Sequence, residues 1–542
     1  MSDVLLSVQD LHTSFRTDSG EVQAVNGISF DLDRGEVLGI VGESGSGKSV
    51  SAYSIMQILA NNGYIKSGKI LFKGDDLTQW NEKQMSQFRG RNCSIIFQDP
   101  MTSLNPVFTI GNQIEEAIRL HTDKKGDEIK ARAKELLELV GINDPEKRLK
   151  QYPFEHSGGM RQRVMIAMAL ACEPDILIAD EPTTALDVTI QNQVIELLRR
   201  INETEKNAMI FITHDLNLAK RICNRVVVMK NGKVVESGDT KEVFEHPEDE
   251  YTKRLVAAVP SRQKAKAATG QQAGTQTGEN GAEISAENSD RKALENVIEI
   301  ENLSVFYADN RDGFFGHRQK RAVVSDASFV IRNGETLGLV GESGCGKSSL
   351  SKAILGMNKD IKGSIRHFSV RPQMIFQDPY SSLNPCKTVE WLLAEPLRAA
   401  GEMERSKRLS KEAVHDAVCD MLYKVGLDES YLNRRPSQLS GGQRQRISIG
   451  QALITKPKLV IADEPVSALD VTLQAQIMEL MRSLQEEMGV AYLFISHDIN
   501  VVYQMSDRIM VMKDGRIIEQ GETMQIFEDP KEDYTKLLLR ES

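Results

Sequence analysis

The feature that most constrains this chain of 542 residues is an internal duplication: one series of motifs occurs twice. The glycine-rich segment at 42–49 recurs at 341–348, an offset of 299 residues. The segment IFQDP at 96–100 recurs at an offset of 279, and all later motifs recur at an offset of 283. A single hydrophobic core rarely grows beyond ~250–300 residues. We therefore predict two related domains, the second shortened by about 20 residues after its first motif.

The segment between the copies differs from both in composition. Residues 261–296 are rich in Ala, Gly, Gln and Thr, which is typical of a flexible linker. This places the first domain at 1–260 and the second at 297–542. Each domain ends in a similar tail, HPEDEYT at 246–252 and DPKEDYT at 529–535.

The order of apolar and polar segments predicts an α/β fold in each copy. Short alternating strands come first, and a buried strand then runs into the glycine-rich loop, with a helix beginning near Ser49. Further strands alternate with helices, as in a doubly wound sheet. A mainly helical insert is expected at about 99–172 and 378–455, including a helix-like stretch from Ile114 to Val140.

Charge and cysteine usage exclude several classes of protein. A net charge of −10 argues against sequence-independent coating of nucleic acid. No apolar stretch approaches the ~18 residues that cross a bilayer, and the N-terminus does not look like a secretion signal. The 6 cysteines form no CxxC pair, which favours a reducing compartment and gives no zinc or iron–sulfur signature. The sequence therefore predicts a cytoplasmic protein.

The repeated glycine-rich segments fit the phosphate-loop pattern GxxxxGK[ST]. In this pattern backbone N–H groups surround phosphate oxygens at the start of a helix. Lys48 and Lys347 would reach the β- and γ-phosphates, and Ser49 and Ser348 would coordinate Mg²⁺, so ATP and Mg²⁺ are the expected cofactors. The expected phosphate-binding residues are Gly42, Ser44, Gly45, Gly47, Lys48 and Ser49, and Gly341, Ser343, Gly344, Gly346, Lys347 and Ser348.

Paired carboxylates follow a buried strand in each copy. The strand ILIAD ends in Asp180 and Glu181, and its counterpart ends in Asp463 and Glu464. Ligands of α/β sheets bind at the carboxyl ends of the strands. Asp180 and Asp463 could hold Mg²⁺, while Glu181 and Glu464 could polarise an attacking water.

A further set of motifs resembles the ATP-binding cassette (ABC) family. Ser157, Gly158 and Gly159 open an apolar helix, as do Ser440, Gly441 and Gly442. The set also includes Gln98 and Gln377, TALD at 184–187, SALD at 467–470, and His214 and His497. The resemblance covers both copies nearly end to end. It implies two tandem P-loop NTPase domains, each with a RecA-like α/β core and a helical subdomain.

The resemblance also implies two composite sites, because cassettes pair head to tail around two ATP molecules. Catalytic roles would fall to Glu181, Glu464, His214 and His497, and Gln98 and Gln377 would contact ATP and Mg²⁺. Adenine would stack on Phe15 and Tyr307, which could instead be ordinary core aromatics. Site one would pair Lys48, Asp180, Glu181 and His214 with Ser440, Gly441, Gly442 and Gln443. Site two would pair Lys347, Asp463, Glu464 and His497 with Ser157, Gly158, Gly159 and Met160.

The tails and the loops QDPMTSLNP and QDPYSSLNP resemble one branch of the family, the ATPases of dipeptide and oligopeptide importers. Fused double-domain chains of this length are similar to the Yej type, which serves microcin C and peptide uptake, with glutathione importers a more distant match. The resemblance implies two integral membrane permeases, an extracytoplasmic solute-binding protein, no nucleic acid, and a peripheral place on the cytoplasmic face of the inner membrane. The alternative is a soluble double cassette acting on ribosomes or DNA, but the low-complexity linker and the absence of CxxC favour the importer.

Cys345 replaces Ser46 within the second phosphate loop. It could be a small residue that fills a tight turn. A helix N-terminus and the neighbouring Lys347 could instead lower its pKa and make the thiol reactive.

Overall fold

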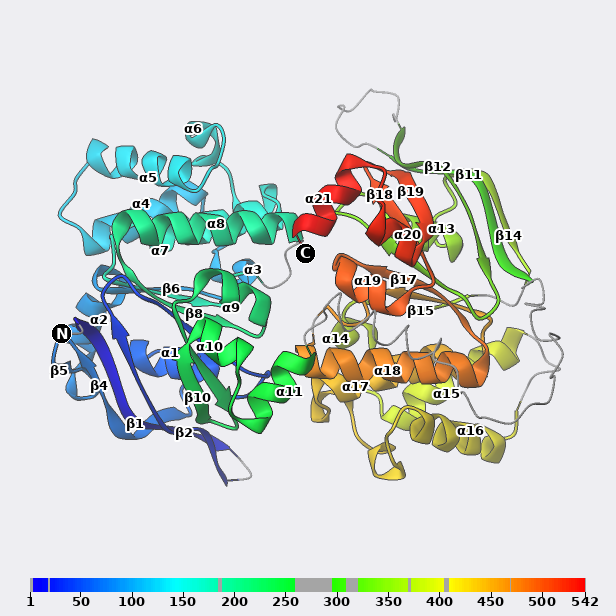
Figure 1. Ribbon diagram of the computed structural model, residues 1–542, viewed down its shortest axis with the longest axis horizontal. Coiled ribbons are helices and arrows are strands. Elements are labelled where there is room, and N and C mark those ends of the chain that lie inside the picture. The colour runs from blue at the N-terminus through cyan, green and yellow to red at the C-terminus, as the bar shows by residue number, and fades with distance from the viewer. Residues whose placement is uncertain are drawn as a thin grey trace, which may run out of the picture. The chain divides into compact units, whose positions relative to one another are not determined.

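The computed structural model describes residues 3–17, 20–183, 188–258, 295–308, 320–368, 372–403, 409–467 and 469–541. The chain divides near residue 260 into two compact units, one for each copy of the motifs (Figure 1). The predicted linker at 261–296 lies outside the described residues except for its last two, and Asn296 already belongs to the first strand of the second unit.

The first unit is built on a six-stranded sheet in the order β10-β9-β3-β8-β7-β6. Its inner strands are parallel, and only β10 at one edge runs antiparallel. The central strands are buried on both faces, which explains their nearly continuous apolar sequence. The strands are β3 (Val37–Val41), β6 (Cys93–Ile96), β7 (Ile176–Asp180), β8 (Ala208–Thr213), β9 (Arg225–Lys230) and β10 (Lys233–Asp239).

The strands expected at the start of the chain form a separate antiparallel sheet, β2-β1-β4-β5. Leu6, Leu11 and Ile28 of this sheet pack with Ile55 of helix α1 and with one face of the six-stranded sheet. Helix α1 (Lys48–Met56), which begins within one residue of the expected position, is thus enclosed by two sheets. The strands are β1 (Val4–Thr17), β2 (Gly20–Asp33), β4 (Gly63–Phe72) and β5 (Asp75–Asp76).

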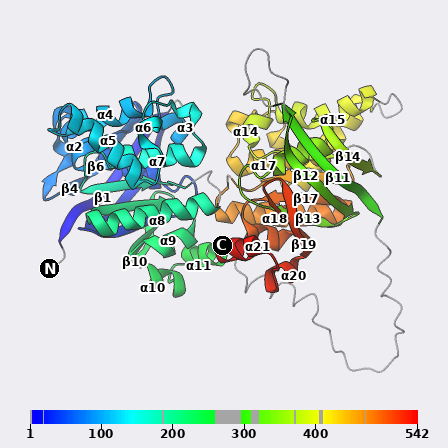
Figure 2. The same ribbon diagram turned by 90° about the horizontal axis from the view of Figure 1, so that it is seen from above.

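Helices α4, α5 and α6 gather at one end of the first unit (Figures 1 and 2). The single stretch expected from Ile114 to Val140 is wrong: α4 ends at His121 and α5 begins at Asp127. Gly126, with φ of 55°, supplies the left-handed turn between the two helices. The helices are α2 (Glu82–Arg91), α3 (Pro100–Ser103), α4 (Ile110–His121), α5 (Asp127–Leu139), α6 (Pro145–Arg148), α7 (Gly158–Ala169), α8 (Val188–Glu205), α9 (Leu216–Ile222), α10 (Thr240–Glu245) and α11 (Glu250–Ala258), with 3-10 turns η1 (Leu77–Gln79) and η2 (Pro153–Glu155).

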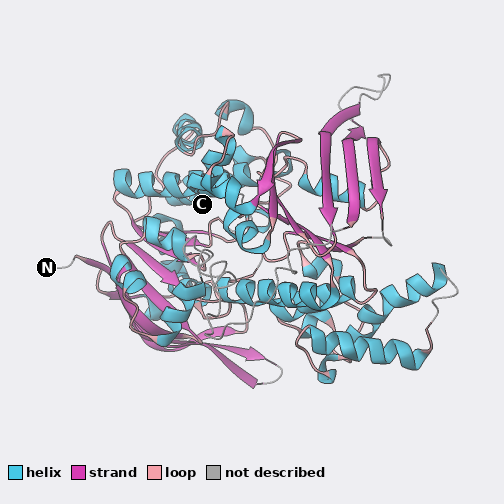
Figure 3. Ribbon diagram, turned by 45° about the vertical axis from the view of Figure 1, so that its right-hand side comes forward, coloured by secondary structure: helices cyan, strands magenta, loops and turns pink. Residues whose placement is uncertain are grey.

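The second unit repeats this plan with a sheet in the order β15-β16-β17-β13-β18-β19. Its antiparallel sheet has three strands, β12-β11-β14, which lie side by side in Figure 3. The strands are β11 (Asn296–Ala308), β12 (Lys320–Arg332), β13 (Thr336–Val340), β14 (Ile361–His367), β15 (Gln373–Ile375), β16 (Leu459–Asp463), β17 (Ala491–Ser496), β18 (Arg508–Lys513) and β19 (Arg516–Glu522).

The shortening of the second copy has a definite place in the fold. The first unit has β5, η1 and α2 between β4 and β6, whereas the second passes from β14 to β15 within residues 368–372. The remaining helices are α13 (Lys347–Ile354), α14 (Pro379–Ser382), α15 (Val389–Met403), α16 (Lys411–Lys424), α17 (Gly441–Leu453), α18 (Val471–Met488), α19 (Ile499–Met505), α20 (Thr523–Glu528) and α21 (Asp533–Glu541), with 3-10 turns η4 (Glu429–Tyr431) and η5 (Pro436–Gln438). In the part of the chain that the structure describes, no helix is both long and apolar enough to span a bilayer.

Candidate active sites

The glycine-rich loop of the first unit runs from the end of β3 into α1. Gly42, Gly45 and Gly47 have φ of 150°, 78° and 101°. A Cβ at Gly42 would lie 2.2 Å from the carbonyl oxygen of Met229, so no other residue fits there. Helix α1 begins without a side-chain cap, and its first N–H groups are therefore available to an anion.

The loop lysines are buried and held against the loop itself. Lys48 Nζ donates hydrogen bonds of 2.8 Å to the carbonyl oxygens of Gly42 and Glu43. Lys347 Nζ does the same with Gly341 and Glu342, over 2.7 and 2.9 Å. Burial lowers the pKa of Lys48, and the nearby Glu181 and Asp180 oppose this effect. The ammonium groups are thus fixed at the phosphate loop.

The geometry of Ser49 and Asp180 shows whether this place suits a Mg²⁺ ion. Ser49 Oγ donates a 2.8 Å hydrogen bond to Asp180 Oδ1. Asp180 is fully buried, and its Oδ2 has no hydrogen-bond partner among the described residues. Burial raises the pKa of Asp180 and of its counterpart Asp463. A buried carboxylate with one open oxygen beside a hydroxyl fits a hard divalent cation.

The glutamates that follow these aspartates have an unusual backbone. Glu181 and Glu464 have φ of 45° and 49°, in the left-handed region that residues other than glycine rarely adopt. Their N–H groups donate to the carbonyl oxygens of Ile212 and Ile495 on the neighbouring strands, each over 2.9 Å. Such strain persists only where surrounding structure imposes it, and it is common at active sites.

Each glutamate carboxylate contacts a glutamine and a histidine. Gln98 Nε2 donates to Glu181 Oε2 over 2.7 Å, and His214 Nδ1 lies 3.2 Å from Glu181 Oε1. Gln377 Nε2 donates to Glu464 over 2.7 Å, and His497 Nδ1 lies 3.2 Å away from the same carboxylate. Both copies of the duplicated unit thus form the same three-residue arrangement.

The contacts with the glutamates shift the pKa of both histidines, and the contact with His497 shifts that of Glu464. Burial lowers the pKa of His214 and His497, but hydrogen bonds to Glu181 and Glu464 outweigh it and leave both raised. Burial alone would raise the pKa of Glu464, yet the bond to His497 brings it below its usual value. The carboxylate of Glu464 is therefore ionised at neutral pH and can act as a base.

The segments SGGM at 157–160 and SGGQ at 440–443, here called the signature segments, cap their helices differently. Ser157 and Ser440 accept hydrogen bonds from the N–H groups of Met160 and Gln443, at 3.4 and 3.3 Å. Gln443 Oε1 also accepts from the N–H of Ser440 at 2.9 Å, which completes a capping box. Met160 has no such oxygen, so the first signature lacks the reciprocal bond.

The residue before each signature serine is buried. Leu439 is the expected apolar residue, and His156 takes its place in the first unit. Neither ring nitrogen of His156 has a hydrogen-bond partner in the described parts of the chain, and burial lowers its pKa. A neutral imidazole here fills the space that leucine fills in the other copy.

Within each unit the structure assembles some predicted residues and separates others. Side chains from several elements meet at the carboxyl ends of the strands: Lys48, Ser49, Gln98, Asp180, Glu181 and His214, and likewise Lys347, Ser348, Gln377, Asp463, Glu464 and His497. Among the described residues, no hydrogen bond or ion pair joins a signature serine to the phosphate loop of its own unit.

The predicted adenine-stacking residues lie on the antiparallel sheets of the two units. Phe15 on β1 is half-buried against Gly63, and Tyr307 on β11 is exposed. The segment TALD at 184–187 lies outside the described residues, as does Ala468 of SALD.

Tyr251 and Tyr534 contact the phosphate loops, and sequence reasoning did not assign them to the sites. The N–H of Glu43 donates to the Tyr251 hydroxyl over 3.1 Å, and the N–H of Glu342 donates to Tyr534 over 3.1 Å. The signal was present in the two YT tails, which had indicated only a branch of the family.

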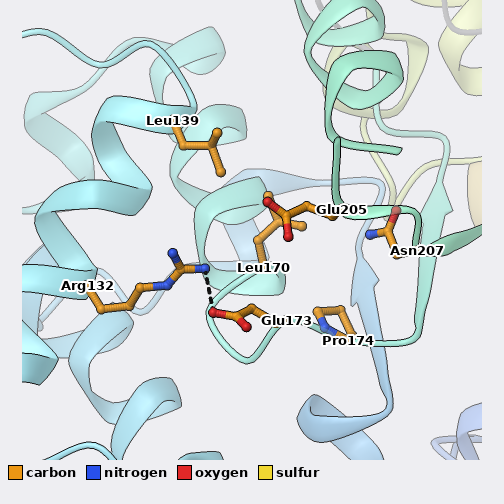
Figure 4. A pocket seen from close by; sticks show the side chains of 7 residues that line it. All are labelled: Arg132, Leu139, Leu170, Glu173, Pro174, Glu205 and Asn207. Carbon is orange, nitrogen blue, oxygen red and sulfur yellow. Dashed lines mark ion pairs between the residues drawn. The ribbon is translucent and has the colours of Figure 1, made fainter. Parts of the chain in front are cut away.

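A separate cavity lies away from these residues (Figure 4). It measures about 240 Å³ and is lined by two residues of α5 and by residues of the segments before β7 and β8, at the amino ends of these strands. Arg132 and Glu173 form an ion pair of 3.2 Å across it. The cavity is therefore not the site formed by the predicted motifs.

A family model described as ABC transporter matches residues 25–184 and 324–467. The chain belongs to the ABC transporter family. A second model, described as the C-terminal region of oligopeptide and dipeptide transporters, matches residues 235–283 of this ABC protein. This protein is an ABC-type ATPase with two tandem cassettes.

Curated ABC relatives are similar over almost the whole chain. The glutathione import ATP-binding protein GsiA of Escherichia coli is 42% identical over 99% of this chain and 89% of its own length. The peptidoglycan transport ATP-binding protein YejF of Agrobacterium fabrum is 42% identical over 99% and 96%. A solved cassette, CbiO1 of Clostridium perfringens, is 30% identical over 45% of this chain and 92% of its own, with a TM-score of 0.40.

These ABC relatives bear on two of the expectations from the sequence. YejF and the glutathione importer have the same 42% identity, and the match covers 96% of YejF and 89% of GsiA. Both are named for import or transport, so the comparisons do not support the ribosome or DNA alternative.

Proposed function

We propose that this chain is the ATP-hydrolysing subunit of an importer for peptides or peptide-like solutes. The observation that carries the proposal is the full-length similarity to two transport ATP-binding proteins, together with the oligopeptide-transporter match at 235–283. It would work with two integral membrane permeases and an extracytoplasmic solute-binding protein. Its place would be peripheral, on the cytoplasmic face of the inner membrane.

In the proposed reaction, ATP phosphates bind the N–H groups of the loop at 42–49 and the ammonium of Lys48. Glu181 takes a proton from water as the water oxygen attacks the γ-phosphorus and the bond to the bridging oxygen breaks. His214 lies 3.2 Å from Glu181, and its raised pKa favours the charged imidazolium beside that carboxylate. Lys347, Glu464 and His497 would act in the same way at the second site.

The proposed Mg²⁺ ligands are Ser49, Asp180 and Gln98, with Ser348, Asp463 and Gln377 in the second unit. Since Gln98 directs its nitrogen at Glu181, its amide oxygen is the atom left for a cation. When bound, Mg²⁺ would neutralise phosphate charge as it develops. Adenine is proposed to stack on Phe15 and Tyr307.

Two ATP molecules are proposed to lie between the cassettes, each shared by both copies. The phosphate-loop residues of one copy would face the signature of the other. The first site would be completed by Ser440, Gly441, Gly442 and Gln443, and the second by Ser157, Gly158, Gly159 and Met160.

The surfaces next to the loops that begin at Gln98 and Gln377 differ between the two units, which supports the proposal of two different permease partners. Ile110 N donates to Gln151 O over 2.8 Å, and Val389 N donates to Arg434 O over 2.9 Å, so each unit joins the same two segments. Around this bond the first unit exposes four large apolar side chains, and the second has polar or smaller residues at the matching positions. The first set is Val107, Phe108, Tyr152 and Phe154, and the second is Cys386, Lys387, Arg435 and Ser437.

Reconstitution with candidate permeases and a binding protein tests the proposal. Ligand-stimulated ATP hydrolysis and solute uptake are measured together for the parent chain, for Phe154→Asp, and for Val22→Asp. Phe154 is 67% exposed on the surface just described, and Val22 is 50% exposed on the antiparallel sheet of the first unit. We expect Phe154→Asp to lose uptake while its ATP binding persists, and Val22→Asp to behave like the parent. Ribosome or DNA binding at micromolar affinity, with no transport by any membrane partner, would overturn the importer proposal.

A further inference from the structure

The C-terminal tail of each unit contacts a single peptide group of the phosphate loop. In the first unit this is the peptide between Gly42 and Glu43. Its carbonyl oxygen accepts from Lys48 Nζ at 2.8 Å, and its N–H donates to the Tyr251 hydroxyl at 3.1 Å. The group that holds the loop lysine is therefore fixed from its other end by a residue about 200 positions away in the sequence.

The second unit forms the same pair of bonds. The carbonyl oxygen of Gly341 accepts from Lys347 Nζ at 2.7 Å, and the N–H of Glu342 donates to Tyr534 at 3.1 Å. The phosphate loops of the two copies differ only where Cys345 replaces Ser46, and both tails contain the segment YTK. The contact is therefore a shared feature of the duplicated unit.

Each tyrosine is positioned by hydrogen bonds between the tail and the last strand of the six-stranded sheet. The carboxylate of Glu236 on β10 accepts from the N–H groups of Glu248 and Asp249 just before α11. Glu519 on β19 does the same for Lys531 and Glu532 before α21. The turn of the tail is therefore anchored beside the last strand of the sheet.

The rings themselves are buried against the end of the neighbouring strand. Tyr251 and Tyr534 are buried, and Lys230 and Lys513 lie over their rings at 4.7 and 4.8 Å from the centroids. Burial raises the pKa of Tyr251 to about 12 and also raises that of Tyr534, so both remain phenols at neutral pH. Each hydroxyl is thus a fixed, uncharged acceptor.

We propose that Tyr251 and Tyr534 are positioning residues for ATP, acting through the peptide that holds Lys48 or Lys347. The tail of each cassette is then part of its nucleotide site, whatever solute the importer carries. The inference rests on the ATPase and not on the proposed import function, because ATP binding can be measured without membrane partners.

The test uses the full chain and the variants Tyr251→Phe, Tyr534→Phe and their combination. Phenylalanine keeps the ring and its contact with lysine but removes the hydroxyl. The adjacent threonines provide matched controls, because Thr252 and Thr535 are buried in the same tails and their hydroxyl oxygens have no hydrogen-bond partner among the described residues. Thr252→Val and Thr535→Val remove a hydroxyl that does not reach the loop.

Binding of a fluorescent ATP analogue is the first measurement. We expect the dissociation constant to rise about 3- to 10-fold in the double tyrosine variant, since one hydrogen bond per site is lost, and to stay at the parental value in the threonine controls. Hydrogen exchange of the peptides covering 42–49 and 341–348 should accelerate in the tyrosine variants only. Parental affinity and parental exchange would overturn the proposal. A lower melting temperature with unchanged affinity would also overturn it, because the hydroxyl would then serve stability alone.

Discussion

Gln98 and Glu181 are joined by a hydrogen bond of 2.7 Å, although 83 residues separate them in the chain. They follow β6 and β7, which are adjacent parallel strands, so two loops meet at one carboxylate. The loop after Gln98 leads to the exposed Val107 and Phe108. That surface and the proposed base are therefore connected by one short segment of chain and one hydrogen bond.

Replacing Glu181 and Glu464 by glutamine should separate ATP binding from hydrolysis. Glutamine keeps the shape of the side chain but cannot accept the proton of the attacking water. We expect ATP to bind with near-parental affinity while turnover falls by ~10²–10³. Steady-state hydrolysis and equilibrium binding of the same preparations check this, with the exposed Glu203→Gln as control. Turnover near the parental rate in the double variant would show that another group is the base.

The stability that His497 contributes should depend on pH. The pKa of His497 is raised above 6.5 in the folded chain, so its bond to Glu464 stabilises fully below the unfolded pKa and is lost as pH rises through the folded value. The difference in melting temperature between the parent and His497→Gln should therefore be largest near pH 6, by about the unfolded pKa of histidine, and shrink toward higher pH.

The lowered pKa of Glu464 sets the lower limit of the pH range in which its bond to His497 stabilises the fold. Its contribution is present above the unfolded pKa and is lost as pH falls through the lower folded value. His246→Gln, at an exposed position outside the sites, is the control. A melting-temperature difference that stays constant across the range would show that His497 is not charged in the folded chain.

Exchanging the residue types at Met160 and Gln443 tests the effect of the capping box on the stability of α7 and α17. Met160→Gln should supply the missing acceptor for the N–H of Ser157 and stabilise the start of α7 by about 0.3–1.5 kcal/mol. Gln443→Met should remove that acceptor from α17 and destabilise it by a similar amount. Chemical denaturation monitored by circular dichroism measures both changes. If both substitutions shift stability in the same direction, the capping interpretation fails.

The cysteines should react in the order of their exposure. Cys345 is 8% exposed and its pKa is raised by burial, which outweighs the effect of Lys347, so the structure contradicts the activated-thiol hypothesis. Cys386 is exposed. At neutral pH we expect maleimide to modify Cys386 first and Cys345 slowly, as read by mass spectrometry of peptides. Equal rates, with protection of Cys345 by ATP, would restore the reactive thiol.

Local sequence predicted most of the fold and the centre of each site, because these depend on short-range patterns. A buried strand ending in Asp180 and Glu181 must place them at the carboxyl edge of a parallel sheet, and a glycine-rich loop before a helix fixes Lys48 in the same region. The break between α4 and α5 lies in the polar segment at 121–128, which contains Gly126 and no apolar residue. The prediction of one helix-like stretch rested on the apolar positions from Ile129 onward and gave this polar segment too little weight.

Features that depend on distant contacts could not be predicted in this way. The bond between Tyr251 and the N–H of Glu43 arises from the path of the whole unit, so the repeated YT tail marks the tyrosine but does not indicate its partner. The capping box at Ser440 and Gln443 was visible, since serine followed three residues later by glutamine is its signature, but the segment had been interpreted only as a family motif. The direction of the Cys345 pKa required knowledge of its burial.

The proposed role of the tail affects how short a fragment of one cassette can be made without weakening its binding of ATP. A fragment of the first unit that stops after β10, at Asp239, would retain every sequence motif of an ATPase and still lack Tyr251. Its loop peptide would be held by Lys48 alone. The smallest autonomous ATP-binding fragment of this half should therefore extend through α11, to Ala258.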